Sequence, residues 1–104
     1  MKECMVCQMI NGEEPCQKIK ENDEFMAIYN TSSRFAGHTF VFPKNHTESY
    51  NEIENIMKFY QFVNTVHSDM IDTNKYTSTK LILKNGKEAG QMIKHIYFEI
   101  IPYE

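Results

Sequence analysis

The sequence lacks the features that identify several classes of protein. Its 104 residues carry a formal net charge of −3, so no excess of positive charge favours nucleic acid or an anionic membrane. No apolar run approaches the roughly 20 residues needed to span a bilayer, and the segment Met1–Cys4 lacks the apolar core of a signal peptide. We therefore expect a cytoplasmic protein with no nucleic-acid or membrane partner.

Repeats, low-complexity tracts and linkers are also missing, which predicts a single domain over residues 1–104. Cysteine is scarce, and three is an odd number, which argues against a closed disulfide framework. In a reducing compartment the motif Cys4-Met5-Val6-Cys7 is typical of a metal-binding or redox-active pair.

The remaining pattern predicts an α+β fold, with an antiparallel sheet of about five strands, one long helix and a short N-terminal helix. Apolar residues recur at three- and four-residue steps from Ile53 to Ile71, so the long helix is placed at 49–72, with Ser49 or Thr47 as its cap. The short helix is placed at 4–10. Strands are predicted at 16–20, 24–29, 38–42, 79–83 and 93–102.

The last predicted strand contains an unusual alternation. Side chains along a strand point to opposite faces in turn, so His95, Tyr97 and Glu99 are expected on one face. The other face takes the apolar residues Ile96, Phe98 and Ile100. The polar face, together with the glycine-containing loop from Asn85 to Gln91, is therefore a candidate ligand site.

Metal-ligating residue types are scattered along the chain. The two-residue gap between Cys4 and Cys7 suits one tetrahedral zinc ion, and Cys16 or histidines would have to complete it. His67 lies on the apolar stripe of the helix, which favours packing, and His38 could satisfy backbone groups. A site made of Cys4, Cys7, His46 and His95 is chemically sensible, although spacing alone leaves a redox role for the cysteines open.

Tyr97 and the loop at 85–91 each allow two interpretations. Tyrosine titrates near pH 10, and a carboxylate such as Glu99 disfavours phenolate, so a space-filling, hydrogen-bonding Tyr97 is favoured over a nucleophile. Backbone N–H groups of the loop would suit an anionic ligand, but Asn85-Gly86 is also an ordinary turn.

Five segments, in their order along the chain, resemble the histidine-triad (HIT) superfamily of nucleotide hydrolases and transferases. The segment GHTFVFPKNH is very close to the family's GHTLVIPKxH, and HIYFEIIP occupies the place of the triad His-φ-His-φ-His-φ-φ. The five segments are Cys4–Pro15, Phe25–Asn30, Gly37–His46, Asn85–Gln91 and His95–Pro102.

This resemblance implies a structural Zn2+ site and a degenerate catalytic centre. Zinc-containing members bind the ion through residues that correspond here to Cys4, Cys7, His46 and His95. The family's nucleophilic histidine is replaced by Tyr97 and its third histidine by Glu99, so nucleotidyl transfer is not expected.

The resemblance also implies a nucleotide pocket and a homodimer joined through the long helix and a strand. The ligand would be a purine nucleoside or nucleotide. The positions that correspond to the family's binding residues are Val6, Met9, Ile28, Asn30, Asn85, Gly90, Gln91 and Tyr97. Two alternatives remain: a hydrolase or transferase that works through Tyr97 or Glu99, and a redox protein that uses Cys4 and Cys7.

Overall fold

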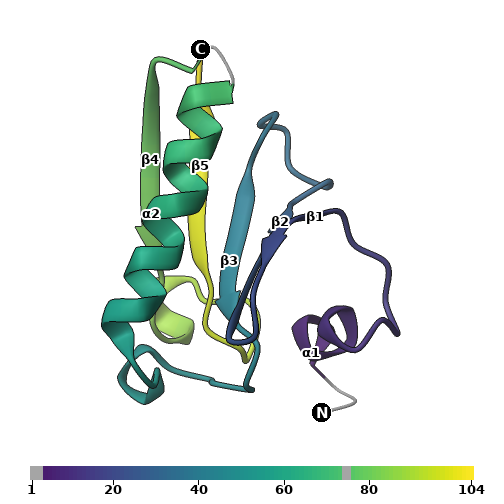
Figure 1. Ribbon diagram of the computed structural model, residues 1–104. Helices are drawn as coiled ribbons and strands as arrows, with labels where there is room; N and C mark the ends of the chain where they lie inside the picture. The colour runs from purple at the N-terminus through teal and green to yellow at the C-terminus, as the bar shows by residue number, and fades with distance from the viewer. Residues whose placement is uncertain (1–3, 74–75) are drawn as a thin grey trace.

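The computed structural model describes residues 4–73 and 76–104 (Figure 1). Its helices are α1 (Met5–Ile10) and α2 (Ile56–Thr73), with two 3-10 turns, η1 (Tyr50–Glu52) and η2 (Lys87–Ala89). Its strands are β1 (Lys18–Glu21), β2 (Phe25–Tyr29), β3 (Thr39–Pro43), β4 (Ser78–Leu83) and β5 (Phe98–Tyr103). The predicted break after the long helix at Asn74 and Lys75 lies outside the described residues.

The five strands form one sheet in the order β1-β2-β3-β5-β4, and every neighbouring pair is antiparallel. The α+β prediction is therefore confirmed, as is the hairpin formed by β1 and β2. Within the described residues, neither helix combines the length and the apolar character needed to cross a bilayer.

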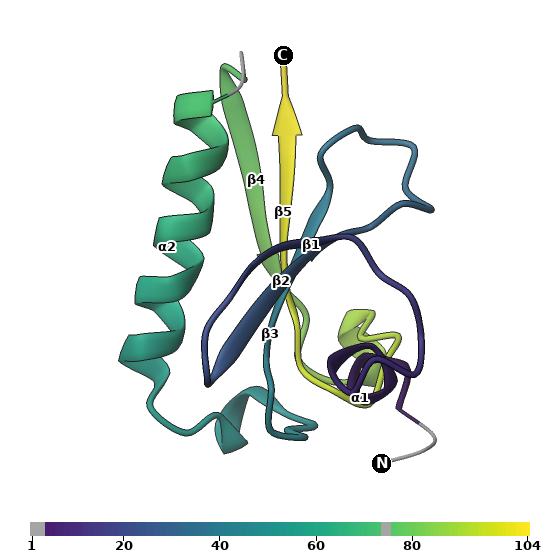
Figure 2. The same ribbon diagram turned by 45° about the vertical axis from the view of Figure 1, so that its right-hand side comes forward.

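The two helices lie on opposite sides of the sheet (Figure 2). Because side chains alternate along a strand, odd-numbered residues of β2 and β3 such as Phe25 and Val41 point towards α2, where they form a core with Phe59 and Ile100. The even-numbered residues Met26, Ile28 and Phe42 belong to a second cluster that includes residues of α1.

The long helix begins at Ile56, so the predicted start at position 49 is wrong. Ile53 is extended, with φ −65° and ψ 118°, and Asn55 has a positive φ of 55°, so the helix cannot run through them. Ser49 caps the separate turn η1 instead, where its N–H and its hydroxyl both donate to Glu52 Oε1, at 3.2 and 2.8 Å. Thr47 donates to the carbonyl of Asn45 and caps no helix.

The last strand begins at Phe98, not at position 93. The residues before it are held by other contacts: the N–H of Ile96 donates to the carbonyl of Thr47 at 2.6 Å, and His95 Nε2 lies 2.7 Å from the carbonyl of Pro43. The predicted alternation survives this correction, because Phe98 and Ile100 pack on the α2 side and Tyr97 belongs to the opposite cluster.

Candidate metal centre and adjoining cavity

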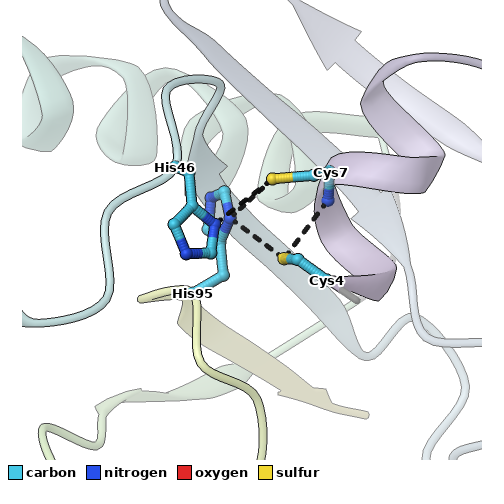
Figure 3. Close-up of side chains that lie close together, drawn as sticks. All are labelled: Cys4, Cys7, His46 and His95. Atoms are coloured by element: carbon cyan, nitrogen blue, oxygen red, sulfur yellow. Dashed lines mark hydrogen bonds between the residues drawn. The ribbon is translucent and has the colours of Figure 1, made fainter. Parts of the chain in front are cut away.

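Four side chains from three distant segments converge at the N-terminal end of α1 (Figure 3). The ligand atoms of Cys4, Cys7, His46 and His95 all lie within 4.8 Å of one another. Cys7 Sγ lies 3.3 Å from His46 Nδ1 and 3.6 Å from His95 Nδ1, and Cys4 Sγ lies 3.5 Å from His95 Nδ1. This is the donor set of a closed tetrahedral zinc site.

Local structure explains why the two thiols face the same way. Cys4 is the extended N-cap of α1, and its sulfur accepts a hydrogen bond from the N–H of Cys7 at 3.4 Å. Three-residue spacing across a helix start brings the two side chains to one side of the turn. The histidines come from the segments that follow β3 and precede β5, which lie next to each other because β3 pairs with β5.

The far side of each imidazole is occupied by an acceptor. His95 Nε2 donates to the carbonyl of Pro43 at 2.7 Å, and His46 Nε2 lies 3.2 Å from Glu48 Oε2. These partners place the proton on Nε2 and leave Nδ1, the atom that faces the thiols, free to bind a metal. The residues present therefore fit a zinc ion both in donor type and in tautomer.

Burial has opposite effects on the readiness of two buried ligands, His95 and Cys7, to bind a cation. Burial lowers the pKa of His95 to about 4, so this imidazole is neutral at physiological pH. Burial, reinforced by the neighbouring Cys4, raises the pKa of Cys7 to about 11 in the absence of a metal. A bound cation reverses the second effect, because it stabilises the thiolate directly.

A cavity of about 170 Å³ lies between α1 and the sheet. Five of the residues predicted to bind the nucleotide line it: Val6, Met9, Ile28, Asn30 and Tyr97. The wall also includes residues that the sequence did not single out, among them Gln17, Thr31, Ser32, Phe40, Phe42 and Ile93. The cavity therefore has aliphatic and aromatic walls and a group of amide and hydroxyl side chains.

The three remaining predicted residues, Asn85, Gly90 and Gln91, are not among those that line this cavity. Both ends of the Gln91 amide are already bonded: its Oε1 accepts from the N–H of Gly86, and its Nε2 donates to the carbonyls of Glu48 and Ile93, each at 2.8 Å. Asn85 Oδ1 accepts from the N–H of Tyr50. Their role towards phosphate stays a prediction.

Tyr97 and Glu99 have separate surroundings. The hydroxyl oxygen of the buried Tyr97 accepts a hydrogen bond from the N–H of Met92 at 3.1 Å. Glu99 Oε1 accepts from His38 Nε2 at 2.9 Å, and Lys84 Nζ lies 3.3 Å from Glu99 Oε2. The two residues therefore share a side of the sheet but have different hydrogen-bond partners.

His38 was the residue that sequence reasoning undervalued. Its expected backbone role is replaced by side-chain contacts, with Glu99 at Nε2 and with Ser33 Oγ at 2.7 Å from Nδ1. The register pairs Phe40 with Glu99, and His38 lies two positions before Phe40 on the same side. Only that register could have indicated the contact. His67, expected to pack, contacts Thr79 Oγ1 at 2.8 Å from its Nε2.

Comparisons with known proteins agree with this geometry. An uncharacterized HIT-like protein of Methanocaldococcus jannaschii is 31% identical over 101 residues, which cover 95% of this chain and 78% of that protein. An adenylylsulfatase of Arabidopsis thaliana is 30% identical over 102 residues, and this chain spans only about half of it, 52%. A crystal structure of a hypothetical histidine triad nucleotide-binding protein from Sulfolobus tokodaii is 32% identical, with a TM-score of 0.91 over 96% of this chain and 68% of that one.

The HIT domain family model matches residues 11–104, from the end of α1 to the C-terminus. The cysteine pair precedes this match, whereas both histidines of the cluster lie within it. Sequence match, sheet topology and structural likeness thus lead to one assignment: the chain belongs to the HIT family.

Proposed function

We propose that the protein binds a purine nucleoside or nucleotide in the cavity beside α1 and does not carry out nucleotidyl transfer. The cavity itself carries this proposal. Its apolar wall of Val6, Ile28 and Phe40 suits the faces of a base, and the polar group around Asn30 and Ser32 suits ribose hydroxyls. The amide of Asn30 both donates and accepts, so it serves a hydroxyl without a formal charge.

We further propose that Cys4, Cys7, His46 and His95 hold a structural zinc ion. A tetrahedral site with four protein ligands has no open position, so the ion would supply a cross-link and no Lewis-acid chemistry. The cross-link would fix α1 against the sheet, and Val6 and Met9 of α1 form part of the cavity wall. Metal and ligand sites would therefore depend on each other.

The absence of transfer chemistry is inferred from Tyr97. Phenol is a poor nucleophile at neutral pH unless a base activates it. Its oxygen already accepts from the N–H of Met92, and Glu99, the carboxylate two residues away, is bonded to His38. Hydrolysis through Tyr97 or Glu99 is the second candidate, favoured by the relative named adenylylsulfatase. It predicts lost activity in Tyr97→Phe or Glu99→Gln.

Binding is tested by thermal unfolding of the zinc-loaded protein with a panel of nucleosides and nucleotides. A ligand at 100 times its Kd stabilises the folded state by about 2.7 kcal/mol, which raises the Tm measurably. Asn30→Ala should reduce the shift, whereas Asn64→Ala on the exposed side of α2 should not. No shift with any member of the panel would contradict the proposal.

Catalysis is tested by hydrolysis of an adenosine phosphoramidate. We expect turnover more than about tenfold below that of a HIT relative with three triad histidines, since general acid–base and nucleophilic roles contribute at least this much. Turnover within about tenfold of that relative would support the second candidate, hydrolysis through Tyr97 or Glu99. A metal-free protein with a cycling Cys4–Cys7 disulfide would support the redox alternative.

The predicted homodimer remains part of the proposal. The prediction names the long helix and an unspecified strand. We assign the strand to β4, which lies at one edge of the sheet, because Leu81 of β4 and Met57 of α2 are exposed apolar side chains. Light scattering after gel filtration measures the mass, and a monomer at micromolar concentration would contradict this part.

A further inference from the structure

The charges around the cavity do not suit a phosphate. Among the described residues that line it, Glu14 is the only charged side chain, and lysine, arginine and histidine are missing from that lining. A phosphate monoester carries a charge of about −1.5 to −2 at neutral pH. Moving such a charge out of water without a cationic partner is costly.

The basic side chains of His38 and Lys84 each already contact an acidic partner. His38 is joined to the polar group of the cavity, since its Nδ1 lies 3.5 Å from Asn30 Nδ2 and 2.7 Å from Ser33 Oγ. Its Nε2 donates to Glu99. Lys84 forms its ion pair with the second oxygen of the same carboxylate.

Glu99 is almost completely buried, with 8% of its side chain exposed. Its position is set by the pairing of β3 with β5, which places it opposite Phe40, itself a residue of the cavity wall. Oε2 makes no hydrogen bond within the described residues, so the Lys84 ammonium is its charge partner. The carboxylate thus already engages both His38 Nε2 and Lys84 Nζ, two donors that an anionic group could otherwise use.

We propose that the cavity selects uncharged nucleosides over nucleotides, and that Glu99 determines this preference by occupying His38 and Lys84. The inference rests on the proposed function and adds the ligand class. Glu99 acts in two ways: it removes the donors that a phosphate needs, and its own buried charge repels an anion beside the cavity.

The test compares adenosine, AMP and 5′-O-methyladenosine by calorimetry on the zinc-loaded protein. The methyl ether adds bulk at the same oxygen without charge, so it separates size from electrostatics. We expect adenosine and its ether to bind within about threefold of each other and AMP at least about tenfold more weakly, a ratio typical of an unfavourable buried charge.

Glu99→Gln then tests the residue. The amide keeps the shape and loses the charge, so the adenosine-to-AMP ratio should fall by at least about fivefold. Glu24→Gln is the matched control, because it removes one carboxylate from an exposed pair with Lys58 and should leave the ratio unchanged. If Glu99→Gln does not fold, the three-ligand series on the unmodified protein still decides whether the cavity prefers uncharged ligands.

The outcomes separate the two proposals. AMP binding as tightly as adenosine would overturn the selectivity and leave the nucleoside cavity intact. If Glu99→Gln leaves the adenosine-to-AMP affinity ratio unchanged, the role of Glu99 is overturned. Binding of none of the three ligands would overturn the proposed function and this inference together.

Discussion

The side of the sheet that carries α2 is packed with hydrocarbon, whereas the side that carries α1 combines a smaller apolar cluster with a group of thiols and imidazoles. On the first side Phe25, Phe59, Phe62 and Ile100 form a continuous core. On the second, α1 is only six residues long and meets the sheet beside a cavity and a cluster of thiols and imidazoles. The comparison teaches that one face of a sheet can supply most of the apolar packing while the other face carries the candidate metal and ligand sites.

Of the changes considered, loss of a metal ligand on the α1 side should lower the free energy of unfolding most. Cys4→Ser is expected to abolish zinc binding and to lower the free energy of unfolding by at least about 5 kcal/mol, part of the 10–16 kcal/mol typical of structural zinc. Elemental analysis and urea unfolding measure the two effects. Cys16→Ser is the matched control, since Cys16 lies outside the cluster. Full stability without zinc would show that α1 needs no cross-link.

A core truncation on the other face should be slightly milder and should leave the metal in place. Phe59→Ala removes a fully buried ring beside Phe25 and is expected to cost about 3–5 kcal/mol. Asn64→Ala, at an exposed position on the same helix, should change stability by less than about 0.5 kcal/mol. Loss of zinc from Phe59→Ala would mean that the two faces are not independent.

The affinity for zinc should depend on pH with a definite sign. The raised pKa of Cys7 means that the metal-free thiol holds its proton at neutral pH, so zinc binding releases it. His95, with its pKa lowered to about 4, has no proton to release above that pH. Affinity should therefore fall by at least about tenfold per pH unit on acidification from pH 8 to pH 6. Competition with a chromophoric chelator measures it, and a flat profile would contradict a protonated Cys7.

The smallest expected effect concerns the carboxylate behind His46. Glu48→Gln removes the negative charge from the acceptor 3.2 Å from His46 Nε2 and should weaken zinc binding by about tenfold, at the low end of such changes because Glu48 is half-exposed. Glu54→Gln, on the same segment but outside the cluster, should have no effect. Equal affinities in the two variants would show that solvent orients this imidazole as well as Glu48 does.

The sequence predicted those features that depend on pattern alone. Strand β3 was predicted from its aromatic and β-branched residues, and the alternation at Tyr97, Phe98 and Ile100 survives in the structure. Convergence of Cys4 and Cys7 with His46 and His95 was predicted through the resemblance, because spacing alone left other ligand sets open.

Other features depend on long-range contacts that no local pattern contains. The start of α2 was misplaced because Asn55 adopts a positive φ within an otherwise helical pattern. The start of β5 was misplaced because His95 turns towards the cysteines before the strand begins. The His38–Glu99 contact spans 61 positions and follows only from the register of β3 with β5.

The cluster at α1 has a consequence for the topology of the chain. Cys4 and His95 are 91 positions apart, so a metal held between them closes almost the entire polypeptide into a ring. A covalent cross-link around a loop of about 100 residues removes enough entropy from the unfolded chain to contribute about 4.7 kcal/mol. A coordination bond would give the same advantage reversibly, so a chelator would return a circular chain to a linear one without breaking a peptide bond.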